Sequence, residues 1–166
     1  METKAVEKSF SLPLSNAEAT GALGELIALQ LVPGDRIFLS GELGTGKTTL
    51  VRGLMVKLGY AGRVKSPTYA LVESYVISKL HLYHFDFYRF TDPEEWEAAG
   101  FRDLFNDANI CLVEWPEKVS ALLPQADLTI RLTHSGIARE ARLIAGSMRG
   151  QAMVDAILPK AAQLSA

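Results

Sequence analysis

A glycine-rich stretch that carries a lysine and two threonines is the part of the sequence with the clearest chemical purpose. Gly41, Gly46, Lys47 and Thr48 fit the pattern G-x-x-x-x-G-K-[ST] of a phosphate-binding loop. Glycines let the backbone curl so that its N–H groups surround an anion, and the helix that follows adds the partial positive charge of its N-terminus. The lysine would contact the outer phosphates, and the Thr48 hydroxyl would ligate a magnesium ion shared with them. The predicted nucleotide-binding residues of this loop are Gly41, Glu42, Leu43, Gly44, Thr45, Gly46, Lys47, Thr48 and Thr49.

The loop predicts a nucleotide with Mg²⁺ as its ligands, and the absence of an Asn-Lys-x-Asp motif for guanine recognition favours ATP. The alternative is a glycine-rich turn between a strand and a helix with an incidental lysine. The apolar run before the loop and the helical apolar pattern after it are the context that a phosphate-binding loop requires, and they favour the nucleotide site.

Two acidic residues are candidates for the other side of the site, since magnesium needs a second acidic anchor for hydrolysis. Glu114 ends the continuous apolar run 110–113, which is typical of a buried strand, so it is the preferred metal ligand beside Thr48. Asp86 lies late in another predicted strand and could hold a metal-bound water or position the attacking water. The structural alternatives are an ordinary acidic strand end for Glu114, and a salt bridge to Arg89 or a turn cap for Asp86.

Four further residues could contribute to the site or simply to the fold. Thr68 follows a Ser-Pro pair in an extended loop, where nucleotide-sensing loops reach the γ-phosphate, although it could equally start a strand. His81 and His84 are three residues apart and so lie on opposite faces of a strand, and we interpret them as packing or hydrogen-bonding residues rather than a metal pair. Trp115 could be a stacking platform or part of the core.

Composition places the chain among ordinary globular proteins. It has 166 residues, of which 48% are hydrophobic and 22% charged, enough for one domain with a core. The net charge of −2 includes no basic excess, so any role with nucleic acid is expected to be indirect. One cysteine, Cys111, excludes an internal disulfide and fits a reducing compartment. Without a signal-like start or a run of about 18 apolar residues, we expect a cytoplasmic protein with no membrane association.

Periodicity and turn signals predict the elements that must position these residues. Ser15 and Glu18 form a capping box, with Ser15 as the N-cap, and Asp92 followed by Pro93 opens another helix. Trp96 and Ala99 are the buried candidates of that second helix. The other predicted elements are an edge strand within 4–12, a strand starting at 36, the helix after the phosphate loop ending near 59, a hairpin of strands 69–77 and 79–87, a strand at 110–113, a brief helix in 116–122, a hairpin of strands 128–133 and 138–145, and a terminal helix at 151–158 that Pro159 breaks.

Several motifs occur in the order in which they appear in one known family. Together they cover residues 10–145, nearly the whole domain. They are Gly41-Glu42-Leu43-Gly44-Thr45-Gly46-Lys47-Thr48-Thr49, Ser66-Pro67-Thr68, His84-Phe85-Asp86-Phe87-Tyr88-Arg89, Asp92-Pro93-Glu94-Glu95, Cys111-Leu112-Val113-Glu114-Trp115-Pro116-Glu117 and Leu123-Pro124. The chain thus resembles the TsaE (formerly YjeE) family, small bacterial ATPases needed to make N6-threonylcarbamoyladenosine in tRNA.

The resemblance implies an α/β fold, a three-layer P-loop NTPase-like architecture with a mixed parallel and antiparallel sheet flanked by helices. We expect one domain over 1–166, with a core of about 10–148, and a C-terminal helical extension at 151–166 is the main departure from the compact family domain. The resemblance also implies an ATP–magnesium site, weak ATPase activity alone, and the TsaD and TsaB proteins as partners, with tRNA reached only through that complex. TsaD, rather than this chain, would transfer the threonylcarbamoyl group.

Site residues follow from the resemblance motif by motif. Lys47 would contact phosphates, Thr48 and Glu114 would hold magnesium, and Asp86 and Thr68 would belong to the catalytic surroundings. The family also places three segments with little sequence signature near the nucleotide, at Ala17, Glu117 and Ala138.

Two other functions use the same loop. A small-molecule or nucleoside kinase usually carries arginines in a lid over the transferred phosphate, whereas the region 89–102 is rich in acidic residues. A nucleotide-gated binding module would use ATP only to order the Thr68 loop for a partner, without meaningful turnover. The module and the ATPase share nearly all their residues, so the sequence alone does not separate them.

Overall fold

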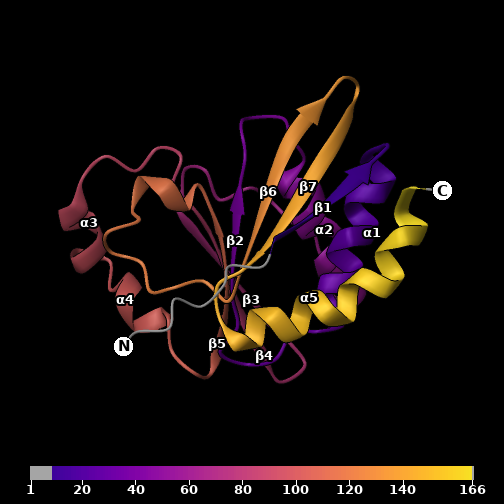
Figure 1. Ribbon diagram of the computed structural model, residues 1–166. Helices are drawn as coiled ribbons and strands as arrows, with labels where there is room; N and C mark the ends of the chain where they lie inside the picture. The colour runs from indigo at the N-terminus through magenta and orange to yellow at the C-terminus, as the bar shows by residue number, and fades with distance from the viewer. Residues whose placement is uncertain (1–8, 166) are drawn as a thin grey trace, which may run out of the picture.

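A single mixed β-sheet forms the centre of the protein in a computed structural model, which describes residues 9–165 (Figure 1). Its strands are β1 (Ser9–Leu14), β2 (Arg36–Ser40), β3 (Val72–Ile77), β4 (Leu80–Asp86), β5 (Asn109–Glu114), β6 (Leu128–Ser135) and β7 (Ala138–Ala145). They lie in the order β1-β7-β6-β2-β5-β4-β3. β2 pairs in parallel with β5 and β6, and β4 with β5, whereas β1–β7, β6–β7 and β3–β4 are antiparallel. This arrangement confirms the predicted α/β fold with a mixed sheet.

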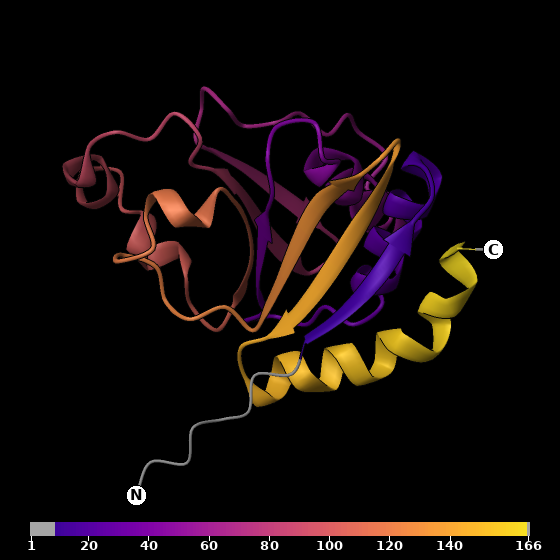
Figure 2. The same ribbon diagram turned by 45° about the horizontal axis from the view of Figure 1, so that its top comes forward.

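Helices cover the sheet from both sides, giving three layers (Figures 1 and 2). They are α1 (Ala17–Ala28), α2 (Lys47–Leu58), α3 (Pro93–Ala98), α4 (Phe101–Leu104) and α5 (Met148–Ala161), with short 3-10 turns η1 (Pro116–Lys118) and η2 (Ala162–Ser165). α1, α2 and α5 share one aliphatic core with the sheet, and α3 and α4 pack on an aromatic core at the opposite face.

The position of β5 in the sheet explains why its apolar and polar residues do not alternate. Ile110 and Leu112 lie in the aliphatic core, while Cys111 and Val113 lie in the aromatic core. Both faces of the strand are therefore covered, as expected for a central strand with parallel neighbours on each side. The same burial raises the pKa of the Cys111 thiol to about 12, which agrees with a core role rather than a nucleophilic one.

Two glycines allow α1 to lie directly against α2. A Cβ atom added at Gly24 would lie 2.1 Å from the Leu50 carbonyl oxygen, and one at Gly53 would lie 2.1 Å from the Gly21 carbonyl oxygen. Only glycine permits this approach of the two backbones. The contact fixes the start of α1 beside the start of α2, where the glycine-rich loop ends.

Two predicted boundaries were wrong for local reasons, and one residue predicted to be buried is exposed. α1 is capped by Asn16, whose side chain accepts a hydrogen bond from the Ala19 N–H at 2.8 Å, and not by Ser15. Strand β3 starts at Val72 rather than at residue 69, because the Leu71 N–H bonds back to the Pro67 carbonyl at 2.7 Å and closes a turn. Ala99 is exposed, and Trp96 alone anchors α3.

The predicted bounds of the terminal helix, 151–158, were also wrong at both ends, since α5 spans Met148–Ala161. Ser147 caps it by accepting from the Gly150 N–H at 3.1 Å, so α5 begins before residue 151. It continues past Pro159 to Ala161. A proline so near the end of a helix removes one late hydrogen bond without stopping it. The part of the predicted edge strand at 4–8 lies outside the described residues, and β1 forms the edge from Ser9.

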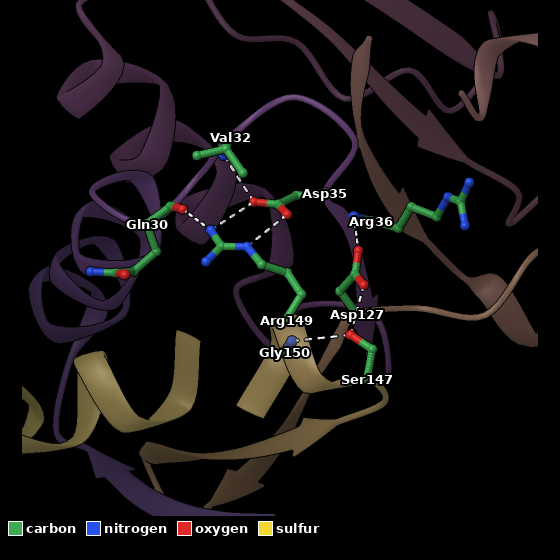
Figure 3. Close-up of polar contacts among 8 residues, drawn as sticks. All are labelled: Gln30, Val32, Asp35, Arg36, Asp127, Ser147, Arg149 and Gly150. Carbon is green, nitrogen blue, oxygen red and sulfur yellow. Dashed lines mark hydrogen bonds and ion pairs between the residues drawn. The ribbon is translucent and has the colours of Figure 1, made fainter. Parts of the chain in front are cut away.

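A buried acid fastens α5 to the rest of the fold (Figure 3). Asp35, which precedes β2, is 2% exposed and accepts hydrogen bonds from Arg149 Nε at 3.0 Å and Arg149 Nη2 at 3.1 Å. Arg149 also donates to the Gln30 carbonyl, and the Val32 N–H donates to Asp35 at 2.9 Å. The C-terminal helix is thus joined to the segment between α1 and β2, at the end of β2 opposite the glycine-rich loop. No helix within residues 9–165 combines the length and apolar character needed to cross a membrane.

Candidate functional site

The glycine-rich loop joins the carboxyl end of β2 to the first residue of α2. Gly41 has φ +147° and Gly46 has φ +105°, conformations that side chains rarely adopt. A Cβ atom at Gly41 would lie 2.5 Å from the Leu132 carbonyl oxygen on β6. The Thr45 hydroxyl donates to the Glu42 carbonyl at 2.8 Å and closes the loop on itself. The backbone therefore has the curled form, ahead of a helix N-terminus, that binds phosphate in other proteins.

Lys47 lies inside this loop rather than in solvent. It is 6% exposed, and its Nζ donates to the carbonyl oxygens of Gly41 and of Glu42, the latter at 3.2 Å. The same atom lies 4.1 Å from the ring centroid of Trp115, which is a cation–π contact. Burial lowers the pKa of Lys47 below its ordinary value of 10.5, and the carboxylate of Glu114 is the largest of the charges that oppose this shift.

A cavity of about 540 Å³ opens in front of the loop, and four separate segments of the chain line it. Its lining residues are Leu43, Gly44, Thr45, Gly46, Lys47, Thr48, Thr49, Ser66, Thr68, Asp86, Tyr88, Arg89, Glu114 and Trp115. The structure thus brings together Lys47, Thr48, Thr68, Asp86 and Glu114, the residues that the sequence predicts for catalysis and metal binding.

The two acidic residues have different surroundings. Asp86 accepts hydrogen bonds from Ser66 Oγ at 3.2 Å and Thr68 Oγ1 at 3.3 Å, and from the Tyr88 N–H at 2.9 Å. Glu114 pairs with the ring of His84, with 2.6 Å between Nε2 and Oε2. Both acids are buried, at 4% and 2% exposure respectively. Three donors hold the Asp86 carboxylate in place, whereas Glu114 has the His84 ring as its partner, and both acids line the cavity.

The alternatives for Asp86 are partly realised. The bond from the Tyr88 N–H is a turn cap, as one alternative expected. Among the described residues no ion pair joins Asp86 to Arg89, which instead lies 4.7 Å from the ring centroid of Tyr69. The Asp86 carboxylate is therefore not paired with the arginine that follows its strand.

Two smaller cavities flank the loop. Ala17 and Ala138 line one of about 430 Å³, together with Gly44, Gly46 and Thr49. Glu117 is exposed and lines another of about 450 Å³, on the side of Gly41 and Trp115. The structure therefore brings Ala17 and Ala138 together, whereas Glu117 lies apart from them on the other flank of the loop.

Three contacts around the site were not predicted from the sequence. Ser66 shares Asp86 with Thr68, and its hydroxyl lies 2.9 Å from that of Thr68. Arg139 on β7 donates to the Gly44 carbonyl at 3.1 Å. The pairing of His84 with Glu114 also went unseen, although the alternation of β4 places His84 and Asp86 on one face. Only the last had a signal in the sequence, because the others depend on how distant segments meet.

The donor set suits phosphate and magnesium. Thr48 and Glu114 present hydroxyl and carboxylate oxygens, the hard ligands that magnesium prefers. Lys47 presents a cation, and the glycines of the loop let backbone N–H groups approach an anion closely. Trp115 has φ +56°, a strained conformation for a tryptophan, and its ring lies 4.9 Å from that of Tyr88 at the edge of the cavity.

Comparisons with known proteins identify the family of the chain. The family described as "Threonylcarbamoyl adenosine biosynthesis protein TsaE" matches residues 14–143. A protein of Haemophilus influenzae named "tRNA threonylcarbamoyladenosine biosynthesis protein TsaE" is 46% identical over 131 residues, which cover 79% of this chain and 83% of that protein. A protein of the same name from Bacillus subtilis is 40% identical over 121 residues, covering 73% of this chain and 75% of that protein.

A solved structure extends the similarity over the C-terminal helix. It is titled "Crystal structure of Bacillus subtilus YdiB" and superposes with a TM-score of 0.76 at 29% sequence identity. The superposition covers 98% of this chain and 97% of that one. On the strength of the family match and of these relatives, the chain belongs to the TsaE family of threonylcarbamoyl adenosine biosynthesis proteins.

Proposed function

We propose that this protein binds ATP with magnesium at the phosphate-binding loop, hydrolyses it, and thereby supports the TsaB–TsaD pair in forming N6-threonylcarbamoyladenosine in tRNA. The names of its relatives support the pathway. One observation carries the chemistry: Lys47, Thr48, Thr68, Asp86 and Glu114 line a single cavity at the loop.

Each group of residues would have a different role in binding and hydrolysis. The loop N–H groups, the start of α2 and Lys47 would bind the phosphates, and the adjoining cavity at Ala17 and Ala138 would accept another part of the nucleotide. Thr48 and Glu114 would hold magnesium, which when bound neutralises charge on the phosphates. Asp86, oriented by Ser66 and Thr68, would position the attacking water. Catalysis by positioning and charge neutralisation is the general pattern of phosphoryl transfer.

Coupling to a partner would run through the Thr68 loop. Thr68 lies between an exposed tyrosine, Tyr69, and the acid Asp86 that faces the cavity. Loss of the γ-phosphate would change what the loop contacts on its inner side and therefore what it presents outside. Slow turnover by the isolated protein is expected, because Arg89 is exposed and no other arginine lines the main cavity among the described residues.

The test is ATP turnover with magnesium, measured for this protein alone and with purified TsaB and TsaD. A slow basal rate that rises with the pair supports the proposal. An unchanged rate together with phosphate transfer to a small acceptor would instead indicate a kinase. Glu114→Ala separates the ATPase from the nucleotide-gated module, since it should abolish both turnover and tRNA modification. Continued tRNA modification by a Glu114→Ala protein that still binds nucleotide would favour the module.

A further inference from the structure

A buried histidine lies directly beneath the two acidic residues of the site. Along one face of β4 the side chains are Leu82, His84 and Asp86, with exposures of 0%, 0% and 4%. Leu82 belongs to the aliphatic core, and Asp86 lines the cavity. His84 therefore occupies the boundary layer, where the apolar interior ends and the polar site begins.

The ring of His84 is joined to the neighbouring strand through one atom. Its Nε2 lies 2.6 Å from Glu114 Oε2, and the two side chains are 0% and 3% exposed. Within residues 9–165 the other ring nitrogen, Nδ1, has no hydrogen-bond partner. If Nε2–H is the donor, a neutral ring leaves only an acceptor without a partner, which costs less than leaving a buried N–H unpaired.

We infer that His84 is a positioning residue for magnesium binding: its Nε2–H fixes one oxygen of Glu114, so that the other oxygen faces Thr48 and the cavity. The inference rests on the proposed function, in which Glu114 holds the metal. It adds a residue outside the phosphate loop, the acidic pair and the Thr68 loop, because His84 itself does not line the cavity.

The need for such a residue follows from what surrounds Glu114. A glutamate has three side-chain torsions, and ordering them before the metal arrives lowers the cost of binding. Lys47 is the cation that competes with magnesium for Glu114, since the Glu114 carboxylate is one of the charges that raise the pKa of Lys47. A donor on the core side holds the carboxylate where it can serve both the metal and the lysine. Groups that orient metal ligands in this way typically change metal affinity by about 10- to 100-fold.

Magnesium titration at a fixed concentration of a non-hydrolysable ATP analogue tests this without relying on turnover. His84→Met keeps an apolar side chain of similar length and removes the donor, whereas His84→Gln restores an N–H near the position of Nε2. We expect His84→Met to raise the half-saturating magnesium concentration about tenfold and His84→Gln to remain within about threefold of the wild type. Binding of the analogue without magnesium should be unchanged in both.

The Glu114→Gln background tells positioning from a general packing effect. If His84 acts through Glu114, adding His84→Met to Glu114→Gln should not shift the magnesium dependence further. Should His84→Met fail to fold, His84→Asn replaces it, because its amide is too short to reach Glu114 and should behave as a loss. Thermal unfolding of each variant verifies that the fold is intact.

The outcomes separate the two claims. A wild-type magnesium dependence in a folded His84→Met or His84→Asn protein overturns the inference and leaves the ATPase proposal standing. Equal weakening of analogue binding with and without magnesium also overturns it, since that is the result of general damage to the site. A wild-type protein that binds no analogue, or binds it without regard to magnesium, overturns the proposed function and the inference together.

Discussion

Asp86 and Glu114 are direct Cα partners at the carboxyl ends of two neighbouring parallel strands, β4 and β5. The register brings the two acids to the same level of the sheet and to the same cavity. Their donors nevertheless differ, since hydroxyl groups from the 66–68 loop bond Asp86 and a core histidine bonds Glu114. Acids that differ in this way are suited to different roles, one coupled to a loop and one fixed to the core.

Substitution of each acid should therefore affect a different kinetic quantity. We expect Glu114→Gln to raise the magnesium concentration needed for half-maximal ATP turnover, because it weakens a metal ligand. Asp86→Asn should lower kcat by about 100-fold at saturating magnesium, because a water-positioning acid acts only on the reaction. Steady-state rates over a range of magnesium concentrations distinguish the two effects.

Glu95→Gln is the matched control for these acids, since Glu95 is exposed on α3, and it should leave both quantities unchanged. The assignment of roles is contradicted if Asp86→Asn behaves as Glu114→Gln does. It is contradicted as well if excess magnesium restores the Asp86→Asn rate.

Thr68 should act through Asp86 rather than by itself. Thr68→Val removes the hydroxyl at nearly constant volume, and the bond from Ser66 still holds the carboxylate, so we expect kcat to fall by only about tenfold. In an Asp86→Asn background the same change should cost less than about twofold, because its target is already altered. A double-mutant cycle on kcat measures this. Full additivity of the two losses would show that Thr68 contacts the nucleotide independently.

Much of the fold was readable from local patterns. The glycine-rich loop, the apolar run that became β5 and the hairpin around Gly136 each have a signal within a few neighbouring residues, and the structure confirms those elements. The exact boundaries of the elements were less predictable. The Leu71–Pro67 turn shortens β3, and α5 passes through Pro159, although the local sequence favoured the opposite in both cases.

The site residues also differ in how far the local sequence predicts them. The Lys47 and Thr48 pair is a motif, and Glu114 follows from the end of a buried strand. The burial of Lys47 against Trp115 has no signal in the motif, which predicts a phosphate contact for the lysine but not the ring beside it. Contacts such as Arg139 with Gly44 join residues 95 positions apart, and no local pattern encodes them.

Lys47→Met should separate nucleotide binding from stability. The lowered pKa of Lys47 means that burying its charge opposes folding below that pKa. In the window between the lowered pKa and 10.5 the unfolded state binds more protons, so the contribution of Lys47 to stability increases with pH. Methionine has no such charge. We therefore expect Lys47→Met to lose ATP affinity by at least about tenfold while its melting temperature stays within about 4 °C of the wild type.

The pH dependence gives this prediction its own check. The free energy of unfolding of Lys47→Met minus that of the wild type should decrease as pH rises from about 7 toward 10.5. Denaturant unfolding at several pH values measures the difference. A difference that grows with pH would mean that the lysine is stabilised as a cation, contrary to the direction of its pKa shift.

Arg149→Met should destabilise the protein without altering its nucleotide site. The change leaves the carboxylate of Asp35, which is 2% exposed, without the guanidinium that donates two hydrogen bonds to it. Breaking a buried pair in this way costs about 3 kcal/mol, whereas the double change Asp35→Asn with Arg149→Met removes the buried charge and should recover part of the loss. Denaturant unfolding measures both, with Arg142→Met, an exposed arginine on β7, as the matched control. ATP affinity gives a second readout. Asp35 and the phosphate loop lie at opposite ends of β2, so the affinity of Arg149→Met for ATP should equal that of the wild type at a temperature where the variant is folded. A loss of affinity with little loss of stability would instead show that the C-terminal helix acts on the nucleotide site.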